Sequence, residues 1–167
     1  MKHTFKQWIP MVSYPEAESV AAISSMEKNG SASLNSFLDF ISGTELPDLQ
    51  EKFTQTFDMS PDTCLDLGWH LYGEAYERGA FMLKIRELLR EQGIAETSEL
   101  PDHLSHILAA LDGLNPDDQK PLVHQYIQPA LTKILVGFKD SDNPFQFAIQ
   151  YMDEQLKRQF GTEGGDA

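Results

Sequence analysis

The side chains of this 167-residue chain that could do chemistry gather in two short segments. The first reads LGWHLYGEAYERGAFM at residues 67–82 and holds a histidine, two glutamates and an arginine among apolar residues and glycines. The second reads ELPDHL at residues 99–104 and sets an aspartate beside a histidine. Side chains of these types serve general acid–base catalysis, metal binding or the recognition of a polar partner.

Asp102 and His103, with His106 three residues later, do not complete a catalytic or metal site. No further convergent ligand and no paired Cys/His spacing accompanies them, as a protein zinc site requires. Cys64 lies near a predicted helix start, where a thiolate is favoured, but has no recognisable partner base. We therefore predict no catalytic residue and no metal site, and a small helical hydrolase built on Asp102 and His103 is disfavoured.

Helical spacing predicts one long helix from about Asp62 to Gln92, with apolar residues on one stripe and on neighbouring faces. Each glycine inside such a helix costs about 1 kcal/mol relative to alanine, so we expect a close approach by a neighbouring backbone or a bound peptide. Glu74 and Arg78 stand at i,i+4, which predicts an ion pair along the helix. That pair either pins a seam of the helical bundle or contributes to binding a partner.

A near-copy of the second segment occurs earlier, where Thr44–Asp48 reads TELPD and Ser98–Asp102 reads SELPD. Two copies suggest a device that begins helices, because hydroxyl and carboxylate groups satisfy free N–H donors and proline pre-sets the backbone. Only the second copy continues with His103, where the first has Leu49. On spacing alone, the histidine is a polar side chain that locks a helix–helix junction, and its near-neutral reference pKa also permits charge switching.

Helix start and stop signals punctuate the whole chain, and little of it reads as strand. Ser60-Pro61, Asn115-Pro116 and Asn143-Pro144 each pair a capping residue with a proline suited to the first helical position. About seven helices with short connections predict an all-α, single-domain helical bundle with a long central helix. We expect this domain over residues 1–160 and a flexible tail at 161–167.

Composition excludes several classes of partner. The formal net charge of −13 and a pI near 4.6 repel nucleic acid and anionic membrane surfaces, and attract a basic peptide. A single cysteine fits a reducing compartment. The N-terminus lacks a long apolar run of the secretory type, and no run approaches the roughly 20 apolar residues that span a bilayer. A cytoplasmic protein without stable membrane insertion is expected.

The two segments resemble the maturation chaperones of molybdenum oxidoreductases, the nitrate reductase delta-subunit group of the NarJ/TorD family. The matching positions in this sequence are His70, Gly73, Glu74, Arg78, Gly79, Met82 and the whole of Glu99–Leu104. The sequence departs from the family pattern at Trp69, Tyr72 and Tyr76, where the family favours an acidic residue, a second histidine and a basic residue.

The resemblance implies a non-enzymatic chaperone that binds the N-terminal region or twin-arginine signal peptide of an apo catalytic subunit. It would assist insertion of the molybdenum cofactor before export or membrane docking. The implied client-binding residues are Trp69, His70, Tyr72, Glu74, Tyr76 and Arg78. Glu99, Pro101, Asp102 and His103 would form a hinge linked to transient contact with the molybdopterin cofactor or a guanine nucleotide, with no cofactor held stably.

Two points stay open at this stage. The protein is expected to be a monomer or a dimer that exchanges helices through the hinge. A helical adaptor or accessory subunit that stays in the finished oxidoreductase complex is the alternative function. Copurification with the mature enzyme would distinguish that subunit from a chaperone.

Overall fold

Local capping chemistry explains where several helices begin. The computed structural model describes residues 5–28, 30–139 and 141–162. The Ser31 side chain accepts a hydrogen bond from the N–H of Leu34 at the start of one helix, and Asn115 accepts one from Asp118 at the start of another. Pro47 and Pro116 stand in the first turn of α3 and α7, where a missing N–H removes no hydrogen bond.

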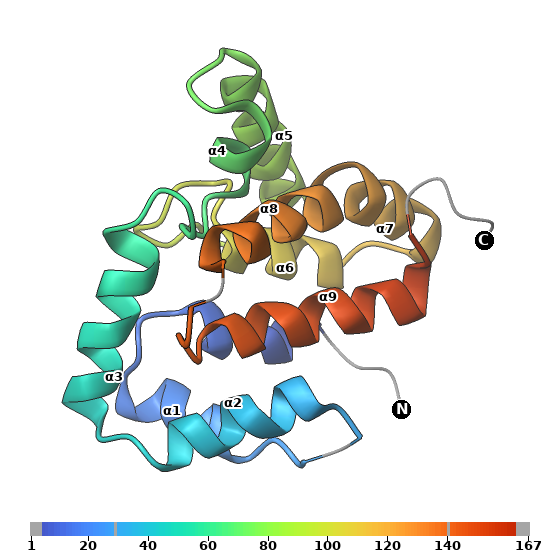
Figure 1. Cartoon of the computed structure of the whole chain (residues 1–167). Helices are drawn as coiled ribbons and strands as arrows, with labels where there is room; N and C mark the ends of the chain where they lie inside the picture. The colour runs from blue at the N-terminus through green and yellow to red at the C-terminus, as the bar shows by residue number, and fades with distance from the viewer. Residues whose placement is uncertain (1–4, 29, 140, 163–167) are drawn as a thin grey trace.

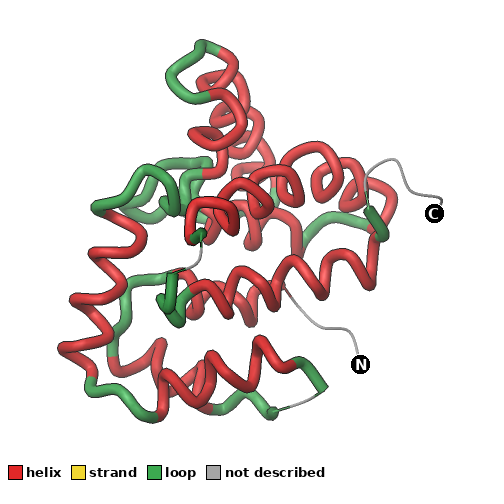
Figure 2. Tube along the Cα trace, viewed as in Figure 1, coloured by secondary structure: helices red, strands yellow, loops and turns green. Residues whose placement is uncertain are grey.

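Helices account for all the regular elements among the described residues (Figure 2). The α-helices are α1 (Ala17–Ser24), α2 (Ala32–Ser42), α3 (Leu46–Phe53), α4 (Leu67–Tyr72), α5 (Glu77–Glu91), α6 (Leu104–Asp112), α7 (Pro116–Leu122), α8 (Gln128–Phe138) and α9 (Gln146–Phe160). A 3-10 segment, η1 (Phe5–Val12), precedes them, and π-helical turns η2 (Thr54–Asp58) and η3 (Val123–Ile127) extend α3 and α7. The all-α prediction is confirmed, with nine α-helices in the described part rather than about seven.

The prediction of one long central helix is wrong. The segment from Asp62 to Gln92 holds two helices, α4 and α5, separated by a turn. Gly73 ends α4 with φ +59°, a backbone conformation that glycine adopts without steric cost. Ser60-Pro61 does not begin a helix either, because residues 61–63 form a turn and α4 starts only at Leu67. Glu74 therefore lies in a turn and not one helical turn before Arg78.

The helices stack in layers, as Figure 1 shows. Helix α8 packs on α9, α9 packs on α2, and α1 packs on α2 at the bottom of the view. Segment η1 packs against α6 in the interior of the stack. Helices α4 and α5 form a hairpin that projects at the top of Figure 1, where α4 contacts α8 and α5 contacts α6. The hairpin that carries the first candidate segment is thus held at its base by two other helices.

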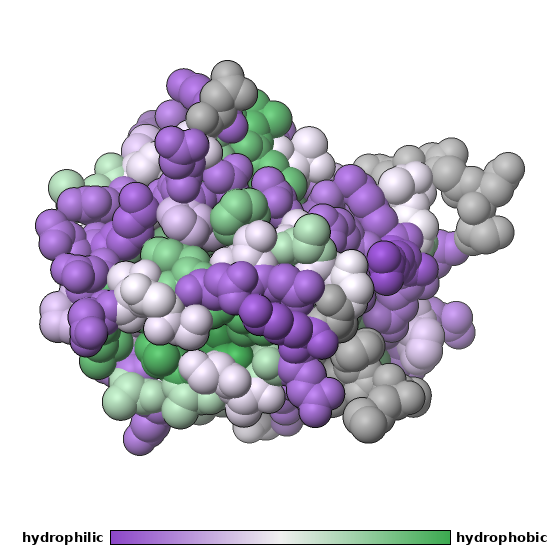
Figure 3. All heavy atoms as spheres, turned by 60° about the horizontal axis from the view of Figure 1, so that its bottom comes forward, coloured by the Kyte–Doolittle hydropathy of each residue, from purple (hydrophilic) through white to green (hydrophobic). Residues whose placement is uncertain are grey.

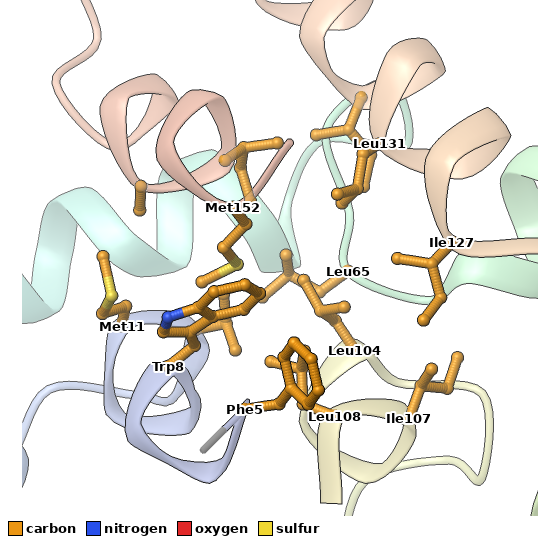
Figure 4. Close-up of a cluster of buried hydrophobic side chains, with 14 of the residues drawn as sticks. Phe5, Trp8, Met11, Leu65, Leu104, Ile107, Leu108, Ile127, Leu131 and Met152 are labelled. Carbon is orange, nitrogen blue, oxygen red and sulfur yellow. The ribbon is translucent and has the colours of Figure 1, made fainter. Parts of the chain in front are cut away.

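One apolar cluster runs through the described residues from Phe5 to Leu156. Figure 4 shows its centre, where Trp8 lies beside Met152 and where side chains from η1, α6, α8 and α9 meet. Leu65 and Leu104 point into this cluster and are almost fully buried. Leu65 lies just before the first candidate segment and Leu104 ends the second, so the core fixes the backbone on which the site is built.

Apolar residues also reach the surface in patches between polar ones, as the space-filling view of Figure 3 shows for one face. The large apolar side chains with the most exposure are Tyr14, Met59, Tyr76, Leu83, Leu100 and Val136. None of the described helices has the length and apolar content needed to cross a membrane. The flexible tail expected at 161–167 lies outside the described residues from residue 163 onward.

Candidate functional site

The two candidate segments, residues 67–82 and 99–104, lie against each other. Residues 65–67 and 102–104 form an isolated antiparallel bridge centred on Asp66 and His103. Two backbone hydrogen bonds hold it, from the N–H of Leu67 to the oxygen of Asp102 (2.9 Å) and from the N–H of Leu104 to the oxygen of Leu65 (2.8 Å). The start of α4 and the start of α6 are therefore joined through the backbone.

A buried ion pair adds a second link between these segments. The Nε of Arg78 donates to the Asp102 carboxylate at 2.9 Å, and a second guanidinium nitrogen lies 3.4 Å from the other carboxylate oxygen. The Asp102 side chain is fully buried, and that of Arg78 is 19% exposed. The same guanidinium lies 3.5 Å from Asp66. Hydrogen bonding to Asp102 raises the pKa of Arg78, so this arginine stays charged.

This ion pair contradicts two expectations drawn from the sequence. Arg78 pairs with a residue 24 positions away, not with Glu74, which is exposed in the turn after Gly73. Asp102 does not cap α6, because its carboxylate is directed to Arg78. The N-cap of α6 is His103, whose Nδ1 accepts the N–H of Ser105. The TELPD and SELPD copies thus differ. In the first copy, Pro47 and Asp48 lie inside the first turn of α3, whereas Asp102 of the second copy lies before α6.

Gly68 explains how the buried carboxylate fits. A Cβ at this position would lie 2.4 Å from the Asp102 Oδ2 and 3.0 Å from the Arg78 Cγ. The first distance is too short for a Cβ and the second is tight, so a side chain at this position would displace the Asp102 carboxylate from α4. The close approach that was expected at the glycines is real here, and the group that approaches Gly68 is a carboxylate.

Two histidines lock the loop that leads to α6. His106 is buried; its Nδ1 donates to the Leu100 oxygen at 2.8 Å and its Nε2 accepts the N–H of Thr97 at 3.0 Å. His103 is also buried. Burial is the main cause, and the nearby His106 a second one, that lowers the pKa of His103 to about 4. Glu99 is half-exposed, with its carboxylate 3.7 Å from the His103 Nε2. The neutral His103 acts as a cap and junction residue, as its spacing suggested.

Two open clefts lie on either side of Trp69. The larger, about 560 Å³, is lined by Trp69, His70, Tyr72, Lys133 and Val136, among others. The smaller, about 310 Å³, is lined by Asp58, Met59, Asp66, Trp69 and Arg78, among others. Pro61 belongs to both clefts, and its carbonyl accepts the indole N–H of Trp69 at 3.1 Å. This hydrogen bond holds the indole as the divider between the two clefts.

The row of clefts continues beyond these two. Met59 also lines a cleft of about 450 Å³ with Tyr14. At the other end, Val136 and Lys139 also line a cleft of about 580 Å³ along α8 and α9. Tyr14, Met59 and Val136 are three of the most exposed large apolar side chains of the described residues. They follow one another along a single row of hollows.

Six residues were expected to bind a client, and they separate into two groups. Trp69, His70, Tyr72 and Arg78 line the two clefts beside Trp69. Glu74 and Tyr76 are exposed in the turn between α4 and α5 and are not among the residues that line those clefts. The structure therefore brings four of the six together with the Glu99–His103 segment, through Arg78.

Cys64 and His70 lie close together without forming a nucleophile and its base. The Cys64 sulfur is 3.6 Å from the His70 Nε2, but that nitrogen donates to the Cys64 carbonyl oxygen at 2.7 Å. Burial raises the pKa of the Cys64 thiol and lowers the pKa of His70. The described residues contain no group of three or more His, Cys, Asp or Glu side chains arranged to hold a metal ion.

Several cleft residues were not foreseen from the sequence. Asp58, Asp66 and Met59 lie just before α4, and Lys133 and Val136 come from α8, more than 60 positions later in the chain. Asp66 stands at the N-cap position of α4, although its side chain makes no capping hydrogen bond, and an aspartate at that position is a signal that a correct helix start would have revealed. No local signal marks Lys133 or Val136, because their place depends on the packing of α8 on α4.

Comparison with known proteins agrees with this architecture. A profile of the nitrate reductase delta subunit family matches residues 24–145. The chain is 30% identical over 105 residues to the nitrate reductase molybdenum cofactor assembly chaperone NarJ of Escherichia coli K12, and equally to that of strain O157:H7. That alignment covers 56% of this chain and 44% of the relative, so the chain matches less than half the length of these proteins.

A solved structure shares the fold. It is that of a putative redox enzyme maturation protein from Archaeoglobus fulgidus, with a TM-score of 0.69 over 94% of this chain and 96% of that one, at 19% identity. The family profile spans most of the chain, including both segments of the candidate site. The chain belongs to the nitrate reductase delta subunit family.

Proposed function

We propose that this protein is a cytoplasmic, non-catalytic assembly chaperone for a molybdenum-containing oxidoreductase. It binds the N-terminal region or signal peptide of the apo catalytic subunit and assists insertion of the molybdenum cofactor before export or membrane docking. Membership of the nitrate reductase delta subunit family supports the proposal. So does the name of its curated relative, a molybdenum cofactor assembly chaperone.

The observation that carries peptide binding is the row of clefts on either side of Trp69. Exposed apolar side chains at Tyr14, Met59 and Val136 recur along this row, so a segment lying in it would bury apolar surface at several points. Burial of such surface drives most peptide recognition, while polar groups set register and specificity. A row of separate hollows suits alternate side chains of an extended segment or one face of a helix.

The two clefts beside Trp69 also differ in charge. Lys133, Lys139 and Asp62 line the larger cleft, and Asp58, Asp66 and Arg78 line the smaller one. Formal charges therefore leave the wall of the larger cleft positive and the wall of the smaller cleft negative. Such an arrangement favours one direction of binding, because the reversed segment would bring like charges together.

The cofactor-linked role of the hinge remains a proposal. Of its four residues, Pro101, Asp102 and His103 are buried, and Glu99 alone exposes much of its side chain. We infer that transient contact with the molybdopterin cofactor or a guanine nucleotide would begin at Glu99. Asp102 would act by holding Arg78 and α5 in place, since its carboxylate has no exposed surface.

Calorimetric titration with a peptide from the N-terminus of a candidate catalytic subunit, taken from a molybdenum oxidoreductase of the same organism, tests the function. We expect binding with a negative heat-capacity change. Trp69→Ala should cost about 2 kcal/mol of binding free energy, the scale of a buried aromatic anchor. Val136→Ser should weaken binding less, because one small side chain is removed from the row.

Leu83→Ser supplies the matched control. Leu83 is exposed like Val136, but it lies on α5 and not among the residues lining the clefts. Normal peptide binding by a folded Trp69→Ala variant would refute binding at this site. Stoichiometric copurification of the protein with the mature, cofactor-loaded enzyme would instead favour a retained accessory subunit.

A further inference from the structure

The projecting hairpin of α4 and α5 presents a small apolar face to solvent (Figure 1). Tyr76 is 86% exposed and Leu83 is 52% exposed, and Gly79 and Ala80 between them are exposed as well. These positions are i, i+3, i+4 and i+7, so they lie on one side of α5. Glu87, one turn further along the same side, is exposed and charged and ends the apolar stretch. We call Tyr76, Gly79, Ala80 and Leu83 the α5 face.

Nothing in the described part of the chain accounts for a glycine at position 79. Its φ is not positive, and a Cβ on Gly79 would meet no atom within 4 Å. Glycine inside a helix is less favourable than alanine, because it loses more backbone freedom on folding. The absent side chain leaves room for a close approach by a second helix, and no helix of the described chain uses that room.

Two charged residues, Glu77 and Lys84, border the α5 face along one edge. They stand seven positions apart, like Tyr76 and Leu83, so both pairs have the same spacing along the helix axis. Both side chains are exposed, and within the described residues neither belongs to a salt bridge. The Lys84 Nζ lies 5.9 Å from the centre of the Tyr126 ring. One negative and one positive charge therefore border the face without an opposite charge in contact.

We propose that the α5 face packs on the same face of a second copy of this chain, with the two α5 helices antiparallel about a two-fold axis near Ala80. The equal spacing of the two pairs then sets Tyr76 opposite Leu83 of the second copy. It also sets Glu77 opposite Lys84 of the second copy, and each contact occurs twice because the interface is symmetric. A parallel arrangement would leave these opposite charges about 10 Å apart along the axis. Charge complementarity thus favours a second copy in the antiparallel direction.

The size of the face limits the strength of this dimer. The apolar contact covers about two helical turns, so it buries less than the roughly 1,200–2,000 Å² of stable interfaces. We therefore expect a weak dimer with a dissociation constant on the order of 100 µM. None of the four residues of the α5 face lines the clefts beside Trp69, so the inference does not depend on the proposed function. Each hairpin also stays in its own chain, unlike in a dimer that exchanges helices.

Sedimentation equilibrium of the full chain measures the self-association. Concentrations from about 10 µM to about 1 mM bracket the expected dissociation constant. Salt at about 0.15 M screens the repulsion between two chains of net charge −13. We expect the average mass to rise with concentration from that of a monomer towards that of a dimer.

Charge reversal tests the antiparallel arrangement. Glu77→Lys and Lys84→Glu each bring like charges together at both contacts and should weaken self-association about tenfold. An equimolar mixture of the two variants should associate more strongly than either alone at the same total concentration, because every contact then joins opposite charges again. Glu18→Lys is the matched control. It makes the same change in net charge as Glu77→Lys, at an exposed position of α1 on the opposite end of the stack, and should associate like the parent chain (Figure 1).

Uncharged changes test the close approach. Gly79→Gln should keep or raise Tm, because glutamine is a better helix former than glycine, and should nevertheless weaken the dimer by filling the space at the two-fold axis. Leu83→Ser should also weaken the dimer. Val136→Ser removes an exposed apolar side chain from α8 and should leave the dimer unchanged.

Several results would overturn the inference. They are a monomer over the whole concentration range, an equal loss in Glu18→Lys, or a mixture no stronger than its separate variants. A dimer that forms by exchange of helices would ignore the charge variants and would overturn it too, as would another protein that covers the α5 face of a chain that stays monomeric. Client-peptide binding by Leu83→Ser is a separate readout, so failure of the dimer and failure of the chaperone function are distinguishable.

Discussion

Replacing Arg78 by methionine tests the buried ion pair most directly. Methionine keeps an unbranched, flexible side chain of good helix propensity in α5 but removes the guanidinium. Asp102 is then left fully buried with no cation beside it, because its carboxylate hydrogen bonds in the described structure come from Arg78. The carboxylate must stay charged without a partner or take up a proton.

Breaking a buried pair in this way costs about 3–5 kcal/mol of folding free energy, since the remaining charge is not solvated. For a chain of this length, each kcal/mol corresponds to roughly 2–4 °C in Tm, so the expected fall is roughly 6–20 °C. The loss should be smaller at pH 5 than at pH 8. At low pH the folded variant can bind a proton at Asp102, and a native state that binds more protons than the unfolded chain loses stability as pH rises.

Thermal unfolding followed by circular dichroism at several pH values measures both effects. Arg86→Met is the control on the same helix, because Arg86 makes a similar two-point contact with Glu96, but at an exposed position. That variant should change Tm little, as exposed ion pairs contribute little. The reasoning fails if Arg78→Met melts like Arg86→Met, or if its deficit is the same at both pH values.

Three further changes probe the same region. Gly68→Ala should destabilise the fold by about 1–3 kcal/mol in chemical unfolding, because its Cβ would overlap the buried Asp102 carboxylate. Gly79→Ala is the control: open space surrounds its Cβ, so it should be neutral or stabilising by up to about 1 kcal/mol. Asp66→Asn should gain stability over the parent as pH rises from about 4 to about 6, because a carboxyl whose pKa is raised from 3.8 to about 6 in the folded state subtracts stability across that window; a gain that appears only below pH 4 would contradict this. His106→Ala should speed hydrogen exchange at the Thr97 amide, which loses its acceptor, with little change at amides in α9.

The fold class was predictable because helix caps and helical periodicity are local signals. Asn115-Pro116 begins α7 as expected, and its side chain makes the predicted capping hydrogen bond. The break at Gly73 was not predicted, although the glycine was visible, because apolar periodicity runs on through the turn. Periodicity reports burial, and each helix of the hairpin buries one face, α4 against α8 and α5 against α6.

The partners of the charged residues were not predictable. Glu74 and Arg78 have ideal helical spacing, yet the ion pair forms across 24 positions with Asp102. A pairing rule based on i,i+4 spacing assumes a continuous helix, and the turn at Gly73 removes that condition. Asp102 likewise looked like a capping residue, because the resemblance between TELPD and SELPD concealed which side chain each aspartate meets. Long-range contacts of this kind follow from packing, which local sequence does not report.

The residues expected to bind the client and those expected to form the hinge turn out to share one network. Arg78 lines the smaller cleft and also holds Asp102, while Asp66 lines that cleft and pairs through the backbone with His103. A group bound against Asp66 therefore acts on the connection between α4 and the start of α6 without touching Asp102 itself. Variants of Asp102 or Arg78 change the stability of the fold and the shape of the cleft together. A binding defect in such a variant therefore does not show which of the two changes caused it. Asp66→Asn leaves both hydrogen bonds between Arg78 and Asp102 possible and removes the charge that lies 3.5 Å from the Arg78 guanidinium, so partner binding by this variant must be compared with its melting temperature.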